Sequence, residues 1–308
     1  MSLLYWLQQL RTPIGDAFFS AITYLGDEAG FLAVALVLYW CIDKNAAYYL
    51  AAIGFSGTAV NQTLKMMFRI PRPWVLDPNF TIVESAREAA TGYSFPSGHT
   101  QNAVGIWGGL AVTRRSTWAR ILAFLPVVLV PISRMYLGVH TPMDVGVSAL
   151  IAVLLVAVFY PLSRRAQHDT KALVLLLAPG VVLGVLTILY MSLASFPADV
   201  DAVHLTAARA NAWKLTGAAA AMLVSALIDR KKLHFETRAP IPAQLLKAIL
   251  GIALVLGLKA VLKAPLYAIL PQYPSDLIRY FVTVLAAGIL WPMTFPYFAR
   301  IGEKKHHE

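Results

Sequence analysis

Residues 133–160 read SRMYLGVHTPMDVGVSALIAVLLVAVFY, and this stretch joins two kinds of sequence. From residue 143 to 161 the chain is almost wholly apolar and long enough to cross a bilayer, which takes about 20 apolar residues. The polar residues at its start are an arginine, Arg134, a histidine, His140, and an aspartate, Asp144. A charged side chain at mid-membrane costs about 2.5–3.5 kcal/mol, so such residues need a partner or water. The stretch indicates a membrane helix with a functional polar site at its end.

The composition of the whole chain agrees with a membrane protein. Of 308 residues, 58% are hydrophobic and 14% are charged, against about a quarter charged in a soluble domain. Cys41 is the one cysteine, which excludes an intrachain disulfide and a Cys-based metal cluster. The net charge of +10 comes from basic residues in short loops between apolar segments. This placement is typical of membrane proteins, and we expect no nucleic-acid partner.

Apolar stretches predict an all-α fold, a polytopic membrane helical bundle of about nine segments. The first is interrupted near Gly26–Gly30, and the third is short for a full span. Residues 1–9 lack the features of a cleavable signal peptide and have an amphipathic pattern, which predicts a helix at the membrane interface. The nine segments are 17–42, 46–68, 98–113, 118–135, 143–161, 172–194, 211–228, 243–270 and 277–299.

The positions of Lys and Arg predict the orientation in the membrane. When the connecting loops alternate between sides, most basic loops and the C-terminal tail fall on one side, which the positive-inside rule assigns to the cytoplasm. The N-terminus and the loop at 69–97 then face outward. We therefore expect an integral protein of a bacterial cytoplasmic (inner) membrane, with its polar clusters at the outer face.

Three polar clusters interrupt the apolar background, at residues 65–73, 95–99 and 133–144. The alternation of loops does not depend on these clusters, yet it puts all three at the same membrane face. Clusters that are far apart in the chain and share one face are expected to form one site.

The first and third clusters supply cations, and the second supplies a helix start. Lys65, Arg72 and Arg134 are three positive groups, and the planar guanidinium of arginine suits phosphate oxygens in particular. Ser97 is a good N-cap, and Gly98 allows a ligand to approach the backbone. Free N–H groups at such a helix start bind anions. The pattern predicts a phosphate-binding pocket.

Two histidines in the clusters predict a reaction as well as binding. One imidazole can attack phosphorus while the other protonates the departing oxygen. His140 is the better nucleophile, because Asp144 follows closely enough to orient its ring, and His99 is the better acid. Thr141 and Pro142 predict a helix start with Asp144 in a capping-box position. The clusters hold too few ligands for a metal cage, so we expect no metal.

Taken together, the three clusters resemble the three-part signature of the type 2 phosphatidic acid phosphatase (PAP2) superfamily. The resemblance covers about residues 30–160. It implies a six-helix catalytic core and metal-independent hydrolysis of a phosphomonoester or diphosphate through a phosphohistidine, with no cofactor. The matching positions are Lys65-x6-Arg72-Pro73, Pro96-Ser97-Gly98-His99 and Ser133-Arg134-x5-His140-x3-Asp144.

The resemblance also implies a role for each site residue and a division of the chain. His140 would be the nucleophile, His99 the leaving-group acid and Asp144 the carboxylate that orients the nucleophile. The expected regions are an N-terminal interfacial and first-segment region at 1–28, a PAP2-like core at 29–165, and additional membrane segments at 166–308. The residues expected to bind phosphate are Lys65, Arg72, Ser97, Gly98 and Arg134.

The expected partners are a phosphorylated lipid substrate and the surrounding membrane lipid. Undecaprenyl diphosphate is the first hypothesis for the substrate, followed by phosphatidate-type or sphingoid phosphates and then by a sugar phosphate. A lipid-binding or transport protein that uses the same pocket is the alternative from another class. Lys259 and Lys263 either neutralise a helix end or mark a second anionic site. The sequence does not decide the oligomeric state.

Overall fold

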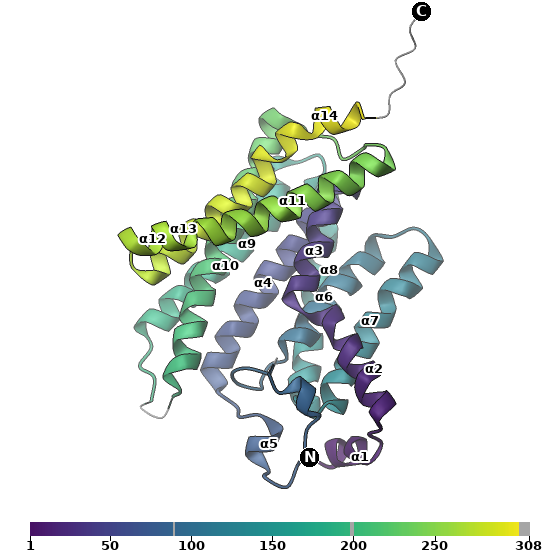
Figure 1. Ribbon diagram of the computed structural model, residues 1–308, viewed down its shortest axis with the longest axis vertical. Coiled ribbons are helices and arrows are strands. Elements are labelled where there is room, and N and C mark those ends of the chain that lie inside the picture. Colours follow the sequence, from purple (N-terminus) through teal and green to yellow (C-terminus); the bar gives the residue numbers. More distant parts are fainter. Residues whose placement is uncertain (89, 198–199, 302–308) are drawn as a thin grey trace, which may run out of the picture.

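The computed structural model describes residues 1–88, 90–197 and 200–301, and within these ranges every regular element is a helix. The long helices form an elongated bundle, with the N-terminus at one end and helices α11 to α14 across the other (Figure 1). Six helices are long and apolar enough to cross a membrane, or seven if a bent pair near the N-terminus counts as one span. The fold is therefore an all-α polytopic bundle, as predicted.

The N-terminal region consists of short helices and one bent pair. α1 (Ser2–Gln9) is the predicted amphipathic helix, and α2 (Pro13–Thr23) follows it. The 3-10 turn η1 (Tyr24–Gly26) leads into α3 (Glu28–Val37). The chain bends by 49° between Pro13–Gly26 and Gly30–Ile42, so the predicted interruption is confirmed.

Four helices surround the polar clusters. α4 is the most central, because it packs against α6, α8, α9 and α10. α6 has 16 residues and is short for a span, and α4 is less apolar than the helices that qualify as spans. Both contact protein rather than lipid over much of their surface, which allows polar residues on them. These helices are α4 (Lys44–Phe68), α6 (Gly98–Thr113), α7 (Thr117–Tyr136) and α8 (Pro142–Ala166).

The loop between α4 and α6 carries the short helix α5 (Pro73–Leu76) and the 3-10 turn η3 (Glu84–Ala86). It lies at the N-terminal end of the bundle, beside α1 (Figure 1). Lys65 is in the last turn of α4, and the other two clusters begin α6 and α8. All three clusters are thus at one end of the molecule, as the loop alternation predicted.

The second half of the chain adds a further layer of helices. α9 and α10 pack on α4, and α11 and α13 cross the bundle obliquely near its other end (Figure 1). Trp40 joins this layer to the first half by donating to the carbonyl of Ala287 at 2.9 Å. The elements are α9 (Thr170–Leu193), α10 (Ala202–Ile228), η4 (Asp229–Leu233), α11 (Ile241–Val261), α12 (Lys263–Ile269), α13 (Gln272–Leu285), η5 (Ala286–Leu290), η6 (Pro292–Thr294) and α14 (Phe295–Ala299).

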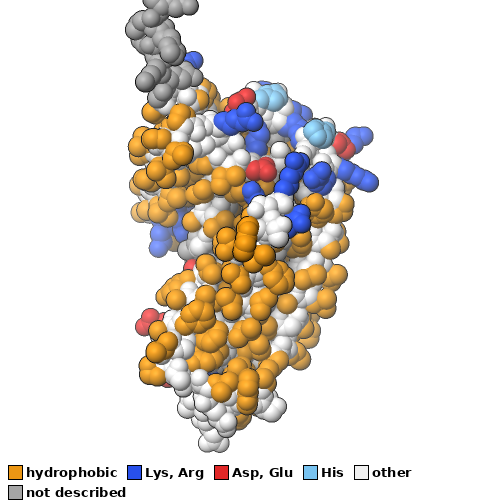
Figure 2. Space-filling model, turned by 90° about the vertical axis from the view of Figure 1, so that its right-hand side faces the viewer, with side chains coloured by type: hydrophobic (Ala, Val, Ile, Leu, Met, Phe, Trp, Pro, Cys, Tyr) orange, Lys and Arg blue, Asp and Glu red, His pale blue; other side chains and the backbone are white. Residues whose placement is uncertain are grey.

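The outer surface is apolar over a broad band. Figure 2 shows hydrophobic side chains over most of one face, and Lys and Arg side chains gathered toward the end that lies opposite the N-terminus. In water such a surface would lead to aggregation, whereas in a bilayer it faces lipid. The protein is therefore an integral membrane protein with multiple spans.

Candidate active site

Two helix starts and one helix end bring the polar clusters together. The side chain of Ser97 accepts from the backbone N–H of Thr100 at 3.4 Å, so Ser97 is the N-cap of α6 as predicted. Thr141 and Asp144 form the predicted capping box at the start of α8. The backbone N–H of Ser97 also donates to the carbonyl of Asp144 at 3.1 Å, which ties the two helix starts directly to each other.

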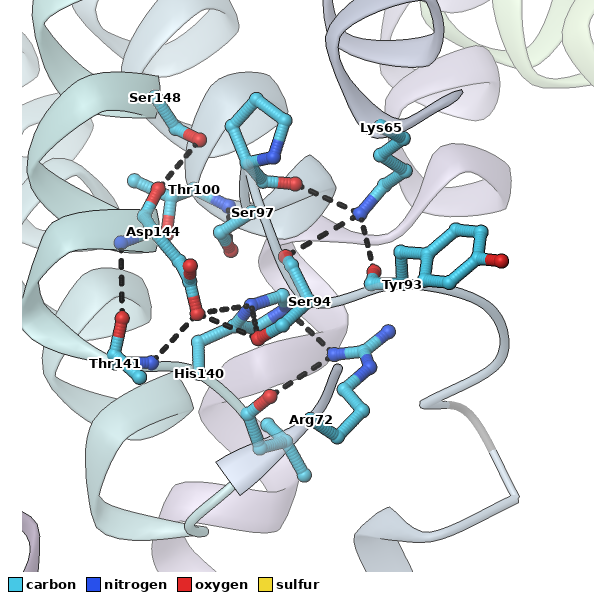
Figure 3. A network of polar contacts seen from close by, with 12 residues as sticks. Lys65, Arg72, Tyr93, Ser94, Ser97, Thr100, His140, Thr141, Asp144 and Ser148 are labelled. Carbon is cyan, nitrogen blue, oxygen red and sulfur yellow. Dashed lines mark hydrogen bonds and ion pairs between the residues drawn. The ribbon is translucent and has the colours of Figure 1, made fainter. Parts of the chain in front are cut away.

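Lys65 holds the loop that precedes α6. Its ammonium donates to the carbonyls of Tyr93 at 2.9 Å and Pro96 at 2.7 Å, and more weakly to that of Ser94 at 3.5 Å (Figure 3). All three partners are neutral carbonyl dipoles. The positive charge of Lys65 is oriented by them but is not neutralised.

Arg72 and Asp144 lie on opposite sides of the His140 ring. Nη1 of Arg72 is 3.0 Å from Nε2 of His140, and Oδ2 of Asp144 is 3.5 Å from Nδ1 (Figure 3). A guanidinium has only donors, so the ring nitrogen that faces it must be the unprotonated one. The proton of a neutral His140 is then on Nδ1, facing the carboxylate. The lone pair available for chemistry is on Nε2.

Backbone carbonyls position Arg72 for this contact. Its guanidinium donates to the carbonyls of Thr91 at 2.7 Å, Gly92 at 3.0 Å and Val139 at 3.0 Å. The side chain of Arg72 is therefore clamped between the loop before α6 and the turn before α8, and only 7% of the residue is exposed.

Asp144 is fixed by more partners than the sequence indicated. Its Oδ2 accepts from the hydroxyl of Ser94 at 2.5 Å and from the backbone N–H of Thr141 at 2.7 Å. Ser94 also lies 3.5 Å from Nδ1 of His140. Ser94 could not be predicted from the sequence, because no spacing rule relates it to a residue 50 positions further along the chain. Its place two residues before Pro96 was the only available signal.

Arg134 is buried, with 1% of its surface exposed. Its Nη1 donates to the hydroxyl of Thr23 at 2.8 Å, a contact from α2 that the sequence analysis also missed. Its Nε is buried and has no hydrogen-bond partner among the described residues. The backbone carbonyl of Arg134 accepts from the N–H groups of Val139 and His140, which turns the chain toward α8.

His99 and Gly98 begin α6 and remain open to a ligand. No hydrogen bond to the His99 ring is formed within the described part of the chain. A side-chain carbon added at Gly98 would have Asn61 as its one neighbour, at 4.0 Å, so there is open space beside the backbone at this position. An anion can approach the free N–H groups of the α6 start there.

The electrostatics of His140 reflect the other charged groups of the clusters. Burial lowers its pKa well below the usual value, and the nearby charges of Arg72, Arg134, Lys65 and His99 lower it further. Asp144 is the carboxylate in direct contact with His140. The structure therefore brings all eight predicted site residues to one end of the bundle, where three cations, Lys65, Arg72 and Arg134, lie near His140. Within the described ranges, no group of three or more His, Cys, Asp or Glu side chains is placed to hold a metal ion.

Two family matches cover different parts of the chain. Residues 45–168 match the PAP2 superfamily, and residues 213–302 match the transmembrane extension of PAP2 superfamily phosphatases. The first match contains all eight predicted site residues, and the second contains α11 to α14.

Several named proteins are similar to about half of the chain. Undecaprenyl-diphosphatase BcrC of Bacillus subtilis is 28% identical over 143 residues, which is 44% of this chain and 70% of that protein. Lipid A 4'-phosphatase of Bacteroides thetaiotaomicron is 28% identical over 183 residues, or 54% of this chain and 80% of that protein. Sphingosine-1-phosphate phosphatase 2 of Mus musculus is 29% identical over 143 residues, or 44% of this chain but only 39% of that protein.

A solved structure, that of Aquifex aeolicus LpxE, aligns with 51% of this chain and 92% of its own at 26% identity, with a TM-score of 0.45. The family matches, together with the complete set of motif residues gathered at one end of the bundle, lead to one conclusion. This chain belongs to the PAP2 superfamily of phosphatases and carries the transmembrane extension of PAP2 superfamily phosphatases.

Proposed function

We propose that this protein hydrolyses a lipid phosphate or diphosphate through a phosphohistidine on His140. The observation that carries the proposal is the pair of contacts on the His140 ring. Asp144 faces Nδ1 and Arg72 faces Nε2, which leaves the attacking lone pair next to a cation that binds phosphate. A protein that only binds phosphate needs the cations but not this oriented imidazole.

The first half-reaction forms the phosphoenzyme. Nε2 of His140 forms a bond to phosphorus as the bond from phosphorus to the lipid oxygen breaks. His99 gives its proton to that oxygen, so a lipid alcohol leaves from a monophosphate, or a lipid monophosphate from a diphosphate. Asp144 stabilises the positive charge that develops on the His140 ring.

The second half-reaction restores the enzyme. A water attacks phosphorus while His99 takes one of its protons. The nitrogen–phosphorus bond then breaks, its electron pair returns to Nε2, and inorganic phosphate leaves. Lys65, Arg72 and Arg134 stabilise the charge on the phosphoryl oxygens in both transition states, usually the largest single contribution to such catalysis. The N–H groups at the start of α6, shaped by Ser97 and Gly98, add to it.

The proposal includes a place in the membrane. Nine crossings and a cytoplasmic basic side would put the pocket at the outer face of a bacterial cytoplasmic membrane. The catalytic unit is then residues 29–165, preceded by 1–28 and followed by the added segments at 166–308. Long-chain substrates in the outer leaflet would reach the pocket without leaving the bilayer.

Undecaprenyl diphosphate is the substrate we place first. A pocket at the outer face suits a carrier lipid that is regenerated there, and BcrC, one of the similar proteins, is named for this activity. Sphingoid phosphates and lipid A are named for other relatives and come next. A sugar phosphate ranks last, because the surface around the pocket belongs to an apolar bundle.

A panel assay of the purified protein in detergent tests the proposal. Phosphate release would be measured from undecaprenyl diphosphate, phosphatidate, a sphingoid phosphate and a water-soluble sugar phosphate at matched concentrations. We expect the long-chain substrates to exceed the soluble one by at least tenfold in kcat/KM, with the diphosphate first. Equal turnover of the soluble compound would remove the lipid assignment.

Rapid quenching with a labelled substrate separates an enzyme from a transport protein. The wild type should yield a labelled phosphoenzyme that is stable in alkali and labile in acid, and His140→Ala should yield none. A protein that moves lipids without hydrolysis would give no labelled protein in either case. Addition of a chelator should leave turnover unchanged.

A further inference from the structure

A cavity lies between α3, α6 and α7, away from the active site. It has a volume of about 450 Å³, which is within the range of about 300–1,000 Å³ typical of small-molecule sites. All but one of its lining residues are apolar, and the exception is Arg114. The lining residues are Ala33, Val34, Val37, Leu38, Ile42, Leu110, Arg114 and Ala119.

A second cavity continues along the same helices. It has a volume of about 160 Å³ and shares Val34 with the first. Its lining includes Ile106 and Asn102 on α6, so the two cavities together follow α6 from its last residues toward its first turns. A hydrocarbon chain lying along α6 would contact apolar side chains in both.

Arg114 closes the end of α6 that lies farthest from the active site. From His99 to Arg114 the helix rises by about 22 Å, at 1.5 Å per residue. Nε and Nη2 of Arg114 are buried, and neither has a hydrogen-bond partner among the described residues. A buried charged donor without a partner is costly, so these two nitrogens are poised for an acceptor that the chain itself does not supply.

We propose that this cavity binds an anionic phospholipid of the leaflet opposite the active site. The headgroup phosphate accepts from Nε and Nη2 of Arg114, in the fork geometry that suits an arginine and a phosphate, and one acyl chain fills the apolar cavity. Basic pockets between membrane helices bind anionic headgroups in this way.

Position and charge both favour a lipid as the occupant. The cavity opens on helices whose outer surface is apolar, where lipid is the surrounding medium. Lys and Arg side chains gather toward the same end of the molecule (Figure 2), which attracts anionic headgroups. The proposal does not rest on the chemistry at His140, because the two sites are separated by the length of α6.

Lipid binding to the purified full-length protein tests the proposal. Retention of phosphatidylglycerol and phosphatidylcholine would be compared by native mass spectrometry after delipidation and titration. We expect wild-type protein to bind phosphatidylglycerol at least tenfold more tightly than phosphatidylcholine, and Arg114→Gln to lose that preference. Equal binding of the two lipids by the wild type would overturn the proposal.

Arg115→Gln is the matched control. Arg115 is the next residue, is exposed and does not line the cavity, so its substitution removes the same charge from the same turn. It should retain the preference for phosphatidylglycerol. If Arg114→Gln and Arg115→Gln weaken binding equally, the attraction comes from surface charge in general and the assigned site is wrong.

Filling the cavity provides a test that keeps Arg114 in place. Ala119 lines the cavity from α7, and Ala119→Phe should displace the acyl chain and lower phosphatidylglycerol binding several-fold. Ala119→Leu is the smaller change if the phenylalanine variant does not fold. His140→Ala should bind phosphatidylglycerol as the wild type does, because the proposed ligand is not the substrate. Unchanged binding by a folded variant with a filled cavity would also overturn the proposal.

Discussion

The active-site end and the C-terminal extension both bury cations, but they treat them differently. At the active site, Lys65 and Arg72 donate mainly to backbone carbonyls, and Arg134 donates to a hydroxyl. Carbonyls and hydroxyls orient a cation without cancelling its charge. Asp144 is the carboxylate beside His140, and its Oδ2 already accepts hydrogen bonds from Ser94 and from the turn before α8.

In the described part of the extension, the buried cation Arg279 meets a carboxylate and the buried cation Lys247 meets the face of an aromatic ring. Arg279 forms an ion pair of 2.5 Å with Asp276 within α13. Lys247 donates to the carbonyl of Thr237 at 2.9 Å and lies 4.3 Å from the ring centre of Phe295. Two exposed lysines of this region also lie over aromatic rings, Lys259 over Tyr280 at 5.6 Å and Lys263 over Tyr267 at 6.0 Å.

This difference distinguishes the active-site end, which can bind an anion, from the extension, where the charges have a structural role. At the active site, the cations outnumber the carboxylates that they contact, and a negatively charged ligand would balance the remaining positive charge. In the extension, a cation with a partner within the protein contributes to helix packing. Loss of one partner from a buried pair leaves the other uncompensated, at a cost of about 3–5 kcal/mol. We therefore expect substitutions at the site to change activity, and those in the extension to change stability.

The largest effect is expected at the nucleophile. His140→Ala should lower kcat/KM by about 10⁴-fold or more, because no other group can form the phosphoenzyme. The measurement is phosphate release by purified protein, with the melting temperature in detergent as the check on folding. Wild-type turnover by this variant would refute the assignment of His140.

A matched pair of arginines tests the comparison itself. Arg134→Gln should lower kcat by about 10²–10³-fold, which is the usual loss when one group that stabilises a transition-state oxyanion is removed. The melting temperature of this variant should change little. Arg279→Gln leaves Asp276 unpaired and should lower the melting temperature clearly, while kcat stays within about twofold. If Arg279→Gln impaired kcat as strongly as Arg134→Gln, the distinction between the two regions would not hold.

A smaller effect is expected at Ser94, which the sequence analysis did not identify. Ser94→Ala removes one hydrogen bond to Asp144 and should lower kcat by about tenfold, or 1.4 kcal/mol in the barrier. Ser94→Thr keeps the hydroxyl and should recover most of the rate. The pair of rates is measured with the same substrate, and the failure of threonine to improve on alanine would argue against the hydrogen bond.

The smallest effect concerns pH. Burial, and next the charge of Arg72, lower the pKa of His140, so in the wild type the attacking imidazole stays neutral below the usual titration range of histidine. Arg72→Gln should raise this pKa and move the acid limb of the kcat/KM profile to higher pH. Arg69→Gln is the control, because Arg69 donates to carbonyls of its own helix. An acid limb that does not move, or moves to lower pH, would contradict the electrostatic account.

Local features of the site could be predicted from the sequence because they depend on neighbouring residues. The N-cap at Ser97 and the capping box at Thr141 and Asp144 follow from contacts across three residues, and the structure confirms both. The contacts of Ser94 with Asp144 and of Thr23 with Arg134 span 50 and 111 residues. Nothing in local spacing determines such pairs, so they were missed.

The segment count shows the same limit. Apolar stretches predicted every long helix, but α4 and α6 do not qualify as spans by length and apolarity alone. Hydropathy measures a helix against lipid, whereas these two helices lie inside the bundle and meet other helices. Nine crossings therefore stay a prediction.

The sequence by itself determined that this protein lies in a membrane, which residue types form its candidate site, and which helix starts carry them. Only the tertiary structure decided that Arg72, rather than Lys65 or Arg134, lies against Nε2 of His140, and that Ser94 shares the carboxylate of Asp144. The physical reason is that hydropathy and capping act along the chain, while the direction of a buried side chain depends on how separate helices and loops pack in space.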